Sequence, residues 1–361
     1  MKTIAVIGTR GFPGIQGGVE MHCENIYPFF SSDMKLRVYR RKPYLTQYSN
    51  KDYPNIEFID LPSTRIKGLE AVLHTFLCVM HILFHRKPQA VHVHNIGPGM
   101  FTPLLRLMGL KVVMTYHSAN YEHAKWGRLA RTLLRLCESI SLRCSHRIIF
   151  VNKFQMQKYS TRVQKKSIYI ANGIHRVTRT PDTQFLEKYG IASGEYLLGV
   201  GRLTPEKGFE YLVQAASSLP NVKQVVIAGN SDHDTTYYEQ LKALDNAHKV
   251  IFTGYTTGED LRQLYSHARM FVLSSVVEGF PLVMLEAMSY GLPLVVSDIP
   301  ASHLVELPHD RYFECRNAQS LAQVLEKHLA DDAPSYQYRL DDYHWPLIAQ
   351  RTEAVFHQLT Q

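Results

Sequence analysis

Short apolar runs alternate with segments of helical periodicity along nearly the whole chain, and this feature most restricts its fold. In the first half the runs lie at 4–7, 36–39, 56–60, 90–94, 112–116, 147–151 and 167–170. Apolar residues recur at helical spacing between them, at 19–30, 69–85 and 130–144. Buried parallel strands joined by helices produce this order, so the first half predicts a doubly wound parallel sheet.

The alternation restarts after a charged, proline-containing stretch at residues 176–181. Apolar runs follow at 196–200, 224–228, 250–253, 270–273 and 294–296, with helical segments near 208–218, 236–247, 258–267 and 282–290. A length of 361 residues suits two domains better than one core. The sequence therefore predicts two Rossmann-like α/β domains, each built on a doubly wound parallel sheet.

The two halves carry opposite charge. Residues 1–180 hold 27 Lys and Arg against 9 Asp and Glu, which leaves 40 − 27 = 13 against 32 − 9 = 23 in the remainder. Such an asymmetry indicates that the first half faces an anionic surface, a lipid-diphosphate acceptor or nucleic acid. The alternative is a basic surface that is merely solvated.

Three features bear on the compartment. The five cysteines include no C-x-x-C pair, and an odd number argues against a disulfide framework. The N-terminus reads as a short strand without the long apolar region of a secretory signal. The most apolar window, residues 69–84, contains Glu70, His74 and His81 and is too short to span a bilayer. We expect a cytoplasmic protein without a transmembrane segment.

A glycine-rich loop follows the first predicted strand. Residues 8–20 read GTRGFPGIQGGVE and place five glycines between a strand and a helix. Accessible backbone amides at a helix N-terminus favour an anion site. The spacing matches neither the dinucleotide motif G-x-G-x-x-G nor the P-loop, which counts against an oxidoreductase and a P-loop NTPase. The alternative is a turn without a ligand.

A second loop, residues 201–208, reads GRLTPEKG and again lies between a strand and a helix. Arg202 and Lys207 can converge on one diphosphate, the arginine as a planar fork and the lysine as a point charge. Isolated cations would otherwise be solvated surface residues.

A third loop, residues 278–288, reads EGFPLVMLEAM, with Glu278 on the turn and Glu286 on the following helix. The other residues of that helix are apolar, so the Glu286 carboxylate needs a partner. Sugar or ribose hydroxyls are suitable donors, and a structural salt bridge is the alternative.

These loops resemble glycosyltransferase family 4, retaining enzymes of the two-domain GT-B fold, and the resemblance covers nearly the whole chain. The most specific match is Glu278-Gly-Phe-x₅-Glu286, followed by Gly201-Arg202 to Glu206-Lys207-Gly208. The opening loop is similar to a subgroup associated with bacterial rhamnosyltransferases and other polysaccharide-assembly enzymes. The resemblance implies two Rossmann-like domains that face across a cleft.

The resemblance also implies how the donor is held. Arg202 and Lys207 would bind its diphosphate, and Gly17 and Gly18 would offer backbone amides to it from the opposite domain. Glu286 would bind the ribose hydroxyls.

The same resemblance assigns the sugar and the base. Glu278 would contact the transferred sugar, and His117 would lie near the reacting carbon; a histidine at a strand end is otherwise often just a hydrogen-bonded interior residue. Gly254 and Tyr255 would contribute backbone to base recognition. The sugar and phosphate pocket would be shaped by three consecutive backbone positions, Phe280, Pro281 and Leu282.

Two further matches set the domain boundaries that we expect. Asn172-Gly173 resembles the family's Asn-Gly turn near the interdomain hinge, and in this fold the terminal helix around Trp345 usually returns to the N-domain. We therefore predict one domain from residues 1–177 with 343–361 and a second, nucleotide-sugar-binding domain from 178–342.

The implied activity is retaining transfer of a hexosyl or deoxyhexosyl group from a UDP-, GDP- or dTDP-sugar. The acceptor would be a glycan or a lipid-diphosphate-linked chain in exopolysaccharide, capsule or O-antigen synthesis. We expect no cofactor and no catalytic metal, because GT-B enzymes generally need none and no Asp-x-Asp motif occurs. His92 and His94 alternate with apolar residues, and a metal site would need further converging ligands.

Residues 126–136, WGRLARTLLRL, place arginines beside leucines on one helical face. This pattern suits an anionic interface, and with the basic first half it predicts peripheral contact with the inner face of the membrane. The alternative is an amphipathic helix packed on the sheet.

Three other functions remain open from the sequence. A sugar-nucleotide epimerase shares the architecture, but its acid and base carboxylates are not evident. A nucleic-acid-binding protein would fit the basic half, yet no recognised motif or regular set of stacking aromatics is present, so we expect no nucleic-acid partner. A catalytically dead donor sensor is disfavoured by the intact set of charged residues.

Overall fold

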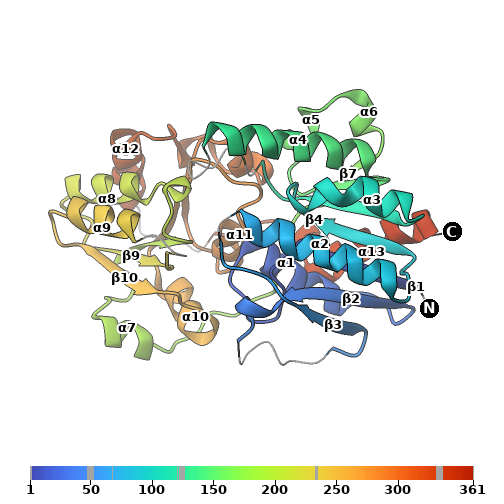
Figure 1. The fold of residues 1–361 in the computed structure, drawn as a ribbon. Helices are drawn as coiled ribbons and strands as arrows, with labels where there is room; N and C mark the ends of the chain where they lie inside the picture. The colour runs from blue at the N-terminus through green and yellow to red at the C-terminus, as the bar shows by residue number, and fades with distance from the viewer. Residues whose placement is uncertain are drawn as a thin grey trace. The chain divides into compact units, whose positions relative to one another are not determined.

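The computed structural model describes residues 2–46, 53–66, 68–119, 121, 127–231, 235–330 and 336–360 (Figure 1). The chain divides into two compact units, one formed by Met1–Gly173 with Asp341–Gln361 and the other by Ile174–Leu340. Within the described ranges, no helix combines the length and the apolar character needed to cross a bilayer.

The first unit is built on a sheet of seven parallel strands in the order β3-β2-β1-β4-β5-β6-β7 among the described residues. The strands are β1 (Lys2–Ile7), β2 (Met34–Arg41), β3 (Ile56–Leu61), β4 (Ala90–His94), β5 (Lys111–Tyr116), β6 (Arg147–Phe150) and β7 (Ser167–Tyr169). The strand order reverses beside β1, which is the topological switch point where α/β sheets bind ligands.

Helices cover both faces of this sheet (Figure 1). They are α1 (Gly18–Ile26), α2 (Leu69–Phe84), α3 (Thr102–Leu107), α4 (Arg128–Cys144), α5 (Lys153–Gln157), α6 (Thr161–Gln164) and α13 (Trp345–Thr360), with short 3₁₀ turns η1 (Tyr27–Phe29), η2 (Lys42–Tyr44), η4 (Pro98–Phe101) and η9 (Asp341–Tyr343). Right-handed crossovers place α2, α3 and α4 on one face and α1 on the other, and α13 packs against α1.

The core of the first unit follows from strand alternation. Val91 and Val93 of β4 pack with Cys78, Val79 and Ile82 of α2, and all five are fully buried. Successive side chains of a strand point to opposite faces, so the residues between these valines lie toward α1 and α13.

The second unit has six parallel strands in the order β10-β9-β8-β11-β12-β13 among its described residues. They are β8 (Tyr196–Val200), β9 (Gln224–Ala228), β10 (Val250–Gly254), β11 (Met270–Leu273), β12 (Leu294–Ser297) and β13 (Tyr312–Phe313). The helices are α7 (Gln184–Tyr189), α8 (Phe209–Ser218), α9 (Thr236–Leu244), α10 (Gly258–His267), α11 (Leu282–Ser289) and α12 (Ala318–Leu329), with 3₁₀ turns η6 (Pro205–Lys207), η7 (Pro300–Leu304) and η8 (His309–Arg311).

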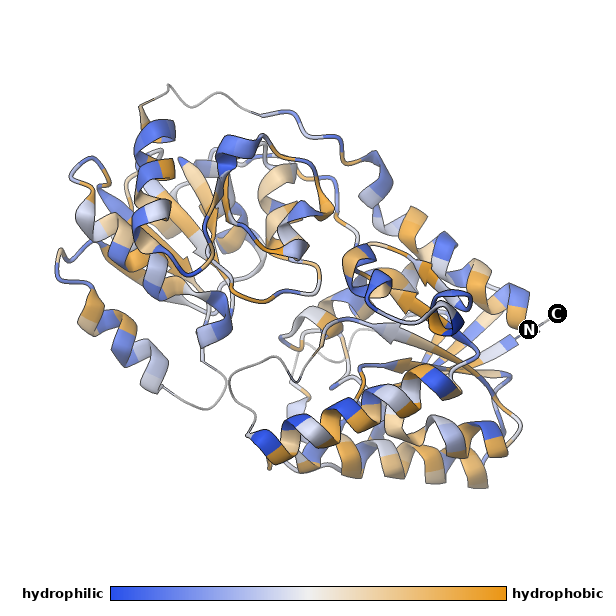
Figure 2. Cartoon of the chain, turned by 90° about the horizontal axis from the view of Figure 1, so that it is seen from above, coloured by the Kyte–Doolittle hydropathy of each residue, from blue (hydrophilic) through white to orange (hydrophobic). Residues whose placement is uncertain are grey.

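Both sheets are mainly hydrophobic, whereas the helices carry hydrophobic and hydrophilic residues side by side (Figure 2). In the second unit, Leu212 and Val213 of α8 pack on Val225 and Ile227 of β9. Burial of such side chains contributes roughly 1.5–3 kcal/mol each and supplies the main driving force for folding. The predicted pair of doubly wound parallel sheets is confirmed.

The observed division lies at 173/174 and 340/341, so the expected boundaries at 177/178 and 342/343 are displaced by a few residues. Gly173, the last residue before the observed boundary, lies against α13 of the first unit, and a Cβ there would meet the Trp345 ring at 2.5 Å. Arg179 belongs to the second, where its Nε donates to the Tyr290 carbonyl at 2.8 Å. At the other boundary, Asp342 of η9 pairs with Arg351 of α13 at 2.9 Å.

Some expected elements differ in extent. The helix expected over 19–30 ends at Ile26 and continues as η1, because Pro28 lies within it. The strand β13 and the helix α12 were not predicted. The two residues of β13 are too few to show an alternating pattern in the sequence. The predicted interfacial segment begins at Trp126, which lies outside the described residues.

Candidate functional site

The carboxyl edge of the second sheet brings two of the predicted loops together. The Val276 amide donates to the Glu206 carbonyl at 2.8 Å, and Ser274 Oγ donates to the Lys207 carbonyl at 2.9 Å. Gly208 between η6 and α8 has φ +61°, and a Cβ there would lie 2.2 Å from the Ser274 carbonyl oxygen. The loops 201–208 and 274–281 are therefore held together by hydrogen bonds, and their close approach requires glycine at position 208.

The charged side chains of these loops pair with one another. Lys207 Nζ lies 2.6 Å from Glu278 Oε1, and Ser275 Oγ donates to the same oxygen at 2.7 Å. Arg202 approaches Glu206 at 3.6 Å. The Lys207 and Glu278 side chains are only 17% and 13% exposed. The structure thus brings three predicted residues, Arg202, Lys207 and Glu278, to one sheet edge.

Glu286 lies on α11 and receives a hydrogen bond from a residue that the sequence analysis missed. The Tyr265 hydroxyl of α10 donates to Glu286 Oε2 at 2.8 Å. Burial raises the pKa of Glu286, and the hydrogen bond from Tyr265 opposes that shift. Tyr265 stacks on Tyr290 with ring centroids 5.2 Å apart. The need for a donor to Glu286 was readable from sequence, but the identity of that donor was not.

The remaining predicted positions of this unit lie at ends of its elements. Phe280, Pro281 and Leu282 are buried and lead into the N-terminus of α11, where Pro281 is the capping residue. Gly254 ends β10 with φ +72°, and Tyr255 beside it is 52% exposed. The carboxyl edge is where parallel sheets bind ligands, so these positions fit a nucleotide site.

In the first unit, the glycine-rich loop follows β1 and ends at the N-terminus of α1. Gly17 caps that helix with φ +150°, and a Cβ there would meet Glu20 Oε2 at 2.1 Å. Glu20 Oε1 accepts the Arg10 amide at 2.9 Å. At Gly18 a Cβ would meet no atom of the described residues within 4 Å, so the loop is tight at Gly17 and open at Gly18.

His117 follows β5 and is 9% exposed. Its ring lies against His22 of α1, with centroids 5.0 Å apart, and His22 Nδ1 lies 2.9 Å from Asn172 Oδ1. His22 also contacts the Trp345 ring at 5.6 Å. The structure therefore gathers the predicted His117 and the Asn172-Gly173 turn around His22, a residue that no sequence signal singled out.

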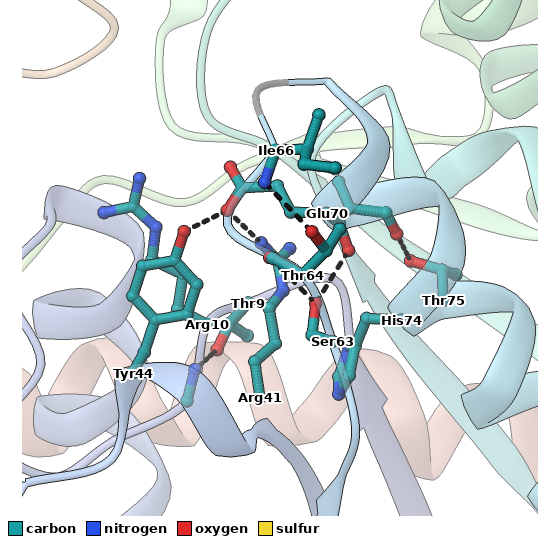
Figure 3. Close-up of polar contacts among 12 residues, drawn as sticks. Thr9, Arg10, Arg41, Tyr44, Ser63, Thr64, Ile66, Glu70, His74 and Thr75 are labelled. Atoms are coloured by element: carbon teal, nitrogen blue, oxygen red, sulfur yellow. Dashed lines mark hydrogen bonds and ion pairs between the residues drawn. The ribbon is translucent and has the colours of Figure 1, made fainter. Parts of the chain in front are cut away.

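A second polar cluster of the first unit surrounds Tyr44 (Figure 3). The Tyr44 hydroxyl donates to Glu70, whose Oε2 also lies 3.5 Å from Arg41 Nη1. The guanidinium carbons of Arg10 and Arg65 lie 4.9 and 5.9 Å from the centre of the Tyr44 ring.

Arg41 itself is buried, and its Nε has no hydrogen-bond partner among the described residues. Burial lowers the pKa of Arg41 and the nearby Glu70 carboxylate raises it. An arginine remains cationic at neutral pH. The Arg41 Nε–H is therefore a buried donor of a charged group that lacks an acceptor among the described residues.

Within the described part of the chain, Asp33, Glu353 and His357 are close enough to converge on one cation. Both Glu353 oxygens already lie 3.3 Å from the Ser31 amide, and no predicted site residue belongs to this group. All five cysteines are free.

Comparison with known proteins gives the family. The model described as Glycosyltransferase Family 4 matches residues 16–176, and the model described as Glycosyl transferases group 1 matches residues 182–343. The two matches follow one another along the chain and correspond to its two units.

Three curated relatives carry related names. An uncharacterized glycosyltransferase of Methanocaldococcus jannaschii is 34% identical over 48% of this chain and 47% of its own length. The alpha-D-kanosaminyltransferase of Streptomyces kanamyceticus is 27% identical over 58% and 59% of the two chains. O-antigen chain mannosyltransferase B of Escherichia coli is 34% identical over 32% and 31%. The aligned parts span less than two thirds of each relative.

Solved structures share the fold over almost the full chain. Sucrose-phosphate synthase from Thermosynechococcus elongatus is 21% identical, with a TM-score of 0.83 over 99% of both chains. Anabaena Alr3699/HepE in complex with UDP-glucose is 15% identical, with a TM-score of 0.73 over 99% of this chain and 98% of the other. With its two parallel-sheet units and two successive family matches, the chain belongs to the family 4 glycosyltransferases of GT-B fold.

Proposed function

We propose that this protein is a retaining glycosyltransferase that moves a hexosyl or deoxyhexosyl group from a nucleoside-diphosphate sugar to a glycan or lipid-linked acceptor. The observation that carries the proposal is the sheet edge that joins Arg202, Lys207 and Glu278. The relative named O-antigen chain mannosyltransferase B supports a role in cell-surface polysaccharide synthesis, and the structure named as a complex with UDP-glucose supports a nucleotide-sugar donor.

The donor diphosphate would replace carboxylates as the partner of two cations. Arg202 and Lys207 each face one glutamate, so the two pairs together are formally neutral before the donor binds. A diphosphate brings charge that these cations can share, and a preorganised pair needs little rearrangement. Gly17 and Gly18 of the first unit would supply backbone amides to the same group.

Glu286 would bind the ribose through the carboxylate that Tyr265 orients. One oxygen accepts the Tyr265 hydroxyl at 2.8 Å, which leaves the other oxygen and further lone pairs for ribose hydroxyls. Gly254 and Tyr255 at the end of β10 would contact the base through their backbone.

In the reaction, the bond between the anomeric carbon and the diphosphate oxygen breaks, and the acceptor oxygen bonds to that carbon on the same face. The diphosphate takes the electron pair and accepts the acceptor hydroxyl proton. Arg202 and Lys207 would stabilise the charge that grows on it, so that neither a metal nor a cofactor is required. Glu278 and His117 would orient the sugar.

The acceptor would meet the first unit, which carries the excess of basic residues. Arg10 and Arg41 lie near Tyr44 (Figure 3), and together with Arg65 they would form a site for the phosphate of such an acceptor. The unsatisfied Nε of Arg41 supports an anionic ligand there, because a buried charged donor without a partner is costly.

A membrane would hold that acceptor near the protein. Leu129, Leu133 and Leu136 of α4 are 86%, 55% and 56% exposed, so these leucines do not pack on the sheet. Phe76 and Phe84 of α2, a helix on the same face of the sheet, are exposed as well. Apolar side chains beside arginines suit peripheral binding to anionic lipid, and we place the protein on the inner, cytoplasmic face of the membrane.

The test is thermal stabilisation by UDP-, GDP- and dTDP-sugars and by the free diphosphates. A ligand at 100 times its dissociation constant stabilises by about 2.7 kcal/mol. Lys207→Ala and Glu286→Ala should lose the shift, whereas Lys223→Ala, which breaks the exposed pair with Glu195, should keep it. Transfer to an acceptor, rather than epimerisation of the donor, separates the two sugar-nucleotide activities.

Binding of DNA without binding of any nucleotide sugar would instead support the nucleic-acid alternative and overturn the proposal. Steep dependence of that binding on salt would identify the basic half as its source. The same screen tests whether the protein belongs to the rhamnosyltransferase-like subgroup, because it identifies the sugar nucleotide that binds.

A further inference from the structure

Behind His117, the first unit contains a continuous row of buried hydrogen-bonding side chains. His117 Nε2 lies 2.9 Å from His94 Nδ1, and His94 Nε2 lies 2.6 Å from the Tyr27 hydroxyl. The same hydroxyl lies 2.8 Å from His92 Nδ1, and His92 Nε2 lies 2.7 Å from Thr115 Oγ1. We call these five residues the histidine chain.

Neighbouring elements of the first unit supply the residues of the histidine chain. His92 and His94 are two residues apart on β4, so they share the sheet face that α1 and α13 cover, while their valine neighbours pack on α2. Thr115 lies opposite His94 on β5, and Tyr27 lies on η1. The Phe356 ring of α13 packs against His92, with ring centroids 5.1 Å apart.

Burial keeps every ring of the chain neutral. Tyr27, His92 and His94 are fully buried, and His117 is 9% exposed. Burial lowers the pKa of His92 to about 3 and holds the pKa values of His94 and His117 well below the usual range. The pKa of Tyr27 is raised by burial. A neutral imidazole has one N–H and one accepting nitrogen, so each ring must donate on one side and accept on the other.

Cys23 Sγ also borders the histidine chain, 3.7 Å from His94 Nε2, but a thiol is only a weak donor and acceptor. The single proton of the Tyr27 hydroxyl then allows two arrangements that satisfy every bond between its oxygen and the ring nitrogens. If Tyr27 donates to His94 Nε2, His94 must donate from Nδ1 to His117, and His92 must donate from Nδ1 to the Tyr27 oxygen. If Tyr27 donates to His92, all of these bonds reverse. His92, His94 and His117 therefore carry their protons together, either all at Nδ1 or all at Nε2.

We propose that the histidine chain fixes which tautomer His117 presents to the transferred sugar. In the first arrangement Nδ1 of His117, the ring nitrogen that does not face His94, is a hydrogen-bond donor, and in the second it is an acceptor. Tyr27, His92, His94 and Thr115 are thus positioning residues for His117. The functional part rests on the proposed function, in which His117 contacts the sugar, whereas the shared tautomer rests on the first unit alone.

Thr115→Val tests the chain from its far end. Valine has nearly the shape of threonine but offers His92 Nε2 no acceptor, and buried donors without an acceptor are rare in proteins. His92 should then hold its proton at Nδ1, which forces Nδ1–H on His94 and His117. Ring nitrogen chemical shifts of ¹⁵N-histidine-labelled protein report the tautomer of each ring, and His→Gln variants assign them.

Two further variants separate the effect of hydrogen bonding in the histidine chain from a general loss of packing. Tyr27→Phe in the Thr115→Val background should release His94 and His117 from the imposed tautomer. Tyr39→Phe is the matched control, because Tyr39 is also fully buried and its hydroxyl bonds to His81 Nδ1 at 3.0 Å outside the chain. This control should leave all three rings as they are in the parent protein.

Uniform Nδ1–H in Thr115→Val that Tyr27→Phe abolishes supports the proposal. Different tautomers among the three rings in the wild type, or Nε2–H on His117 in Thr115→Val, would overturn it. With the donor found by the nucleotide screen, whichever of Thr115→Val and Tyr27→Phe changes the His117 tautomer should lower kcat roughly 10-fold to 100-fold with little change in KM, and Thr115→Ser, which keeps the hydroxyl, should retain the wild-type kcat. An unchanged kcat despite a changed His117 tautomer would refute the functional part. The spectra need no donor, so failure of the glycosyltransferase assignment would be seen separately.

Discussion

Lys207 and Glu278 form a 2.6 Å ion pair across two loops that are 71 residues apart in sequence. Both side chains are largely buried, so removal of one partner leaves a charge that water solvates poorly. The pair links the cation that would bind the diphosphate to the carboxylate that would bind the sugar.

A double-mutant cycle with Lys207→Met and Glu278→Gln should therefore be non-additive. We expect a coupling free energy of about 0.5–3 kcal/mol in urea unfolding, with the double variant more stable than the sum of the single changes predicts. The exposed Lys223–Glu195 pair should give less than about 1 kcal/mol by the same cycle. Equal coupling in the two pairs would show that burial of the first has no energetic consequence.

Glu286→Gln should change how stability depends on pH. Burial raises the pKa of Glu286 in the folded protein, so the folded state binds this proton more tightly than the unfolded state. The stabilising contribution is complete below the unfolded pKa, near 4.5, and is lost as pH rises through the folded pKa. Urea unfolding from pH 4.5 to 8 should show Glu286→Gln gaining stability over wild type as pH rises, while nucleotide-induced stabilisation falls.

Tyr265→Phe should change the pH dependence of the unfolding free energy in the opposite direction to Glu286→Gln. The Tyr265 hydrogen bond favours the charged form of Glu286, so its loss should raise the pKa further and steepen the fall in stability with pH. A Glu286→Gln difference that stays constant over this range would contradict the argument.

Gly208→Ala should destabilise the second unit more than Gly190→Ala. Both glycines are left-handed, with φ +61° and +64°, which costs roughly 1–2 kcal/mol for alanine. In the described part of the chain, the new Cβ at Gly208 would meet a backbone atom, the Ser274 carbonyl oxygen at 2.2 Å, while no atom lies within 4 Å of a Cβ at Gly190. The additional loss should be on the order of 1–3 kcal/mol by urea unfolding, together with weaker nucleotide binding; equal losses would refute the close approach.

The sequence predicted where the loops of the second unit lie, because the strand before each loop and the helix after it are visible in the local pattern. Arg202, Lys207 and Glu278 each follow a strand, and carboxyl ends of parallel strands share one edge. It did not predict that Lys207 and Glu278 pair, since that contact depends on how two loops are fastened. Tyr265 was missed for a related reason: its hydroxyl reaches Glu286 from another helix, and a tyrosine with this role has no sequence signature.

The first unit shows the same limit. His92 and His94 alternate with apolar residues in the sequence, and the structure buries both rings. Their partners Tyr27 and Thr115 come from other elements, so hydrophobic periodicity could not identify a hydrogen-bonded chain. At the second domain boundary, Asp342 lies in the first unit, where it pairs with Arg351 of α13, and an ion pair of this kind has no sequence signature.

The buried histidines should make the protein sensitive to acid. Burial lowers the pKa of His22 to about 4 and that of His92 to about 3, from an ordinary value of 6.5. Between about pH 6.5 and 4 the unfolded chain binds protons that the folded protein excludes, so stability is present above pH 6.5 and falls with decreasing pH. Each such histidine contributes about 1.4 kcal/mol per pH unit in that window.

His22→Gln should therefore reduce the slope of unfolding free energy against pH by up to about one proton, measured by urea unfolding from pH 7.5 to 5. Val93→Ala, which lies between His92 and His94 and carries no titrating group, should lower stability equally at every pH. A His22→Gln slope equal to that of wild type would show that this ring does not exclude protons in the folded state.

Leu129, Leu133 and Leu136 should determine binding to anionic membranes. They recur at helical spacing on α4, and transfer of a leucine from water contributes on the order of 1.5 kcal/mol or more. Changing all three to glutamine should lower partition onto phosphatidylglycerol vesicles in flotation by at least roughly tenfold, while Thr132→Gln, an exposed position of the same helix, should not. Arg128→Gln with Arg135→Gln should weaken the dependence on salt but spare part of the apolar binding. Wild-type protein that fails to float, or a triple variant that floats equally well, would remove α4 from the proposed membrane contact.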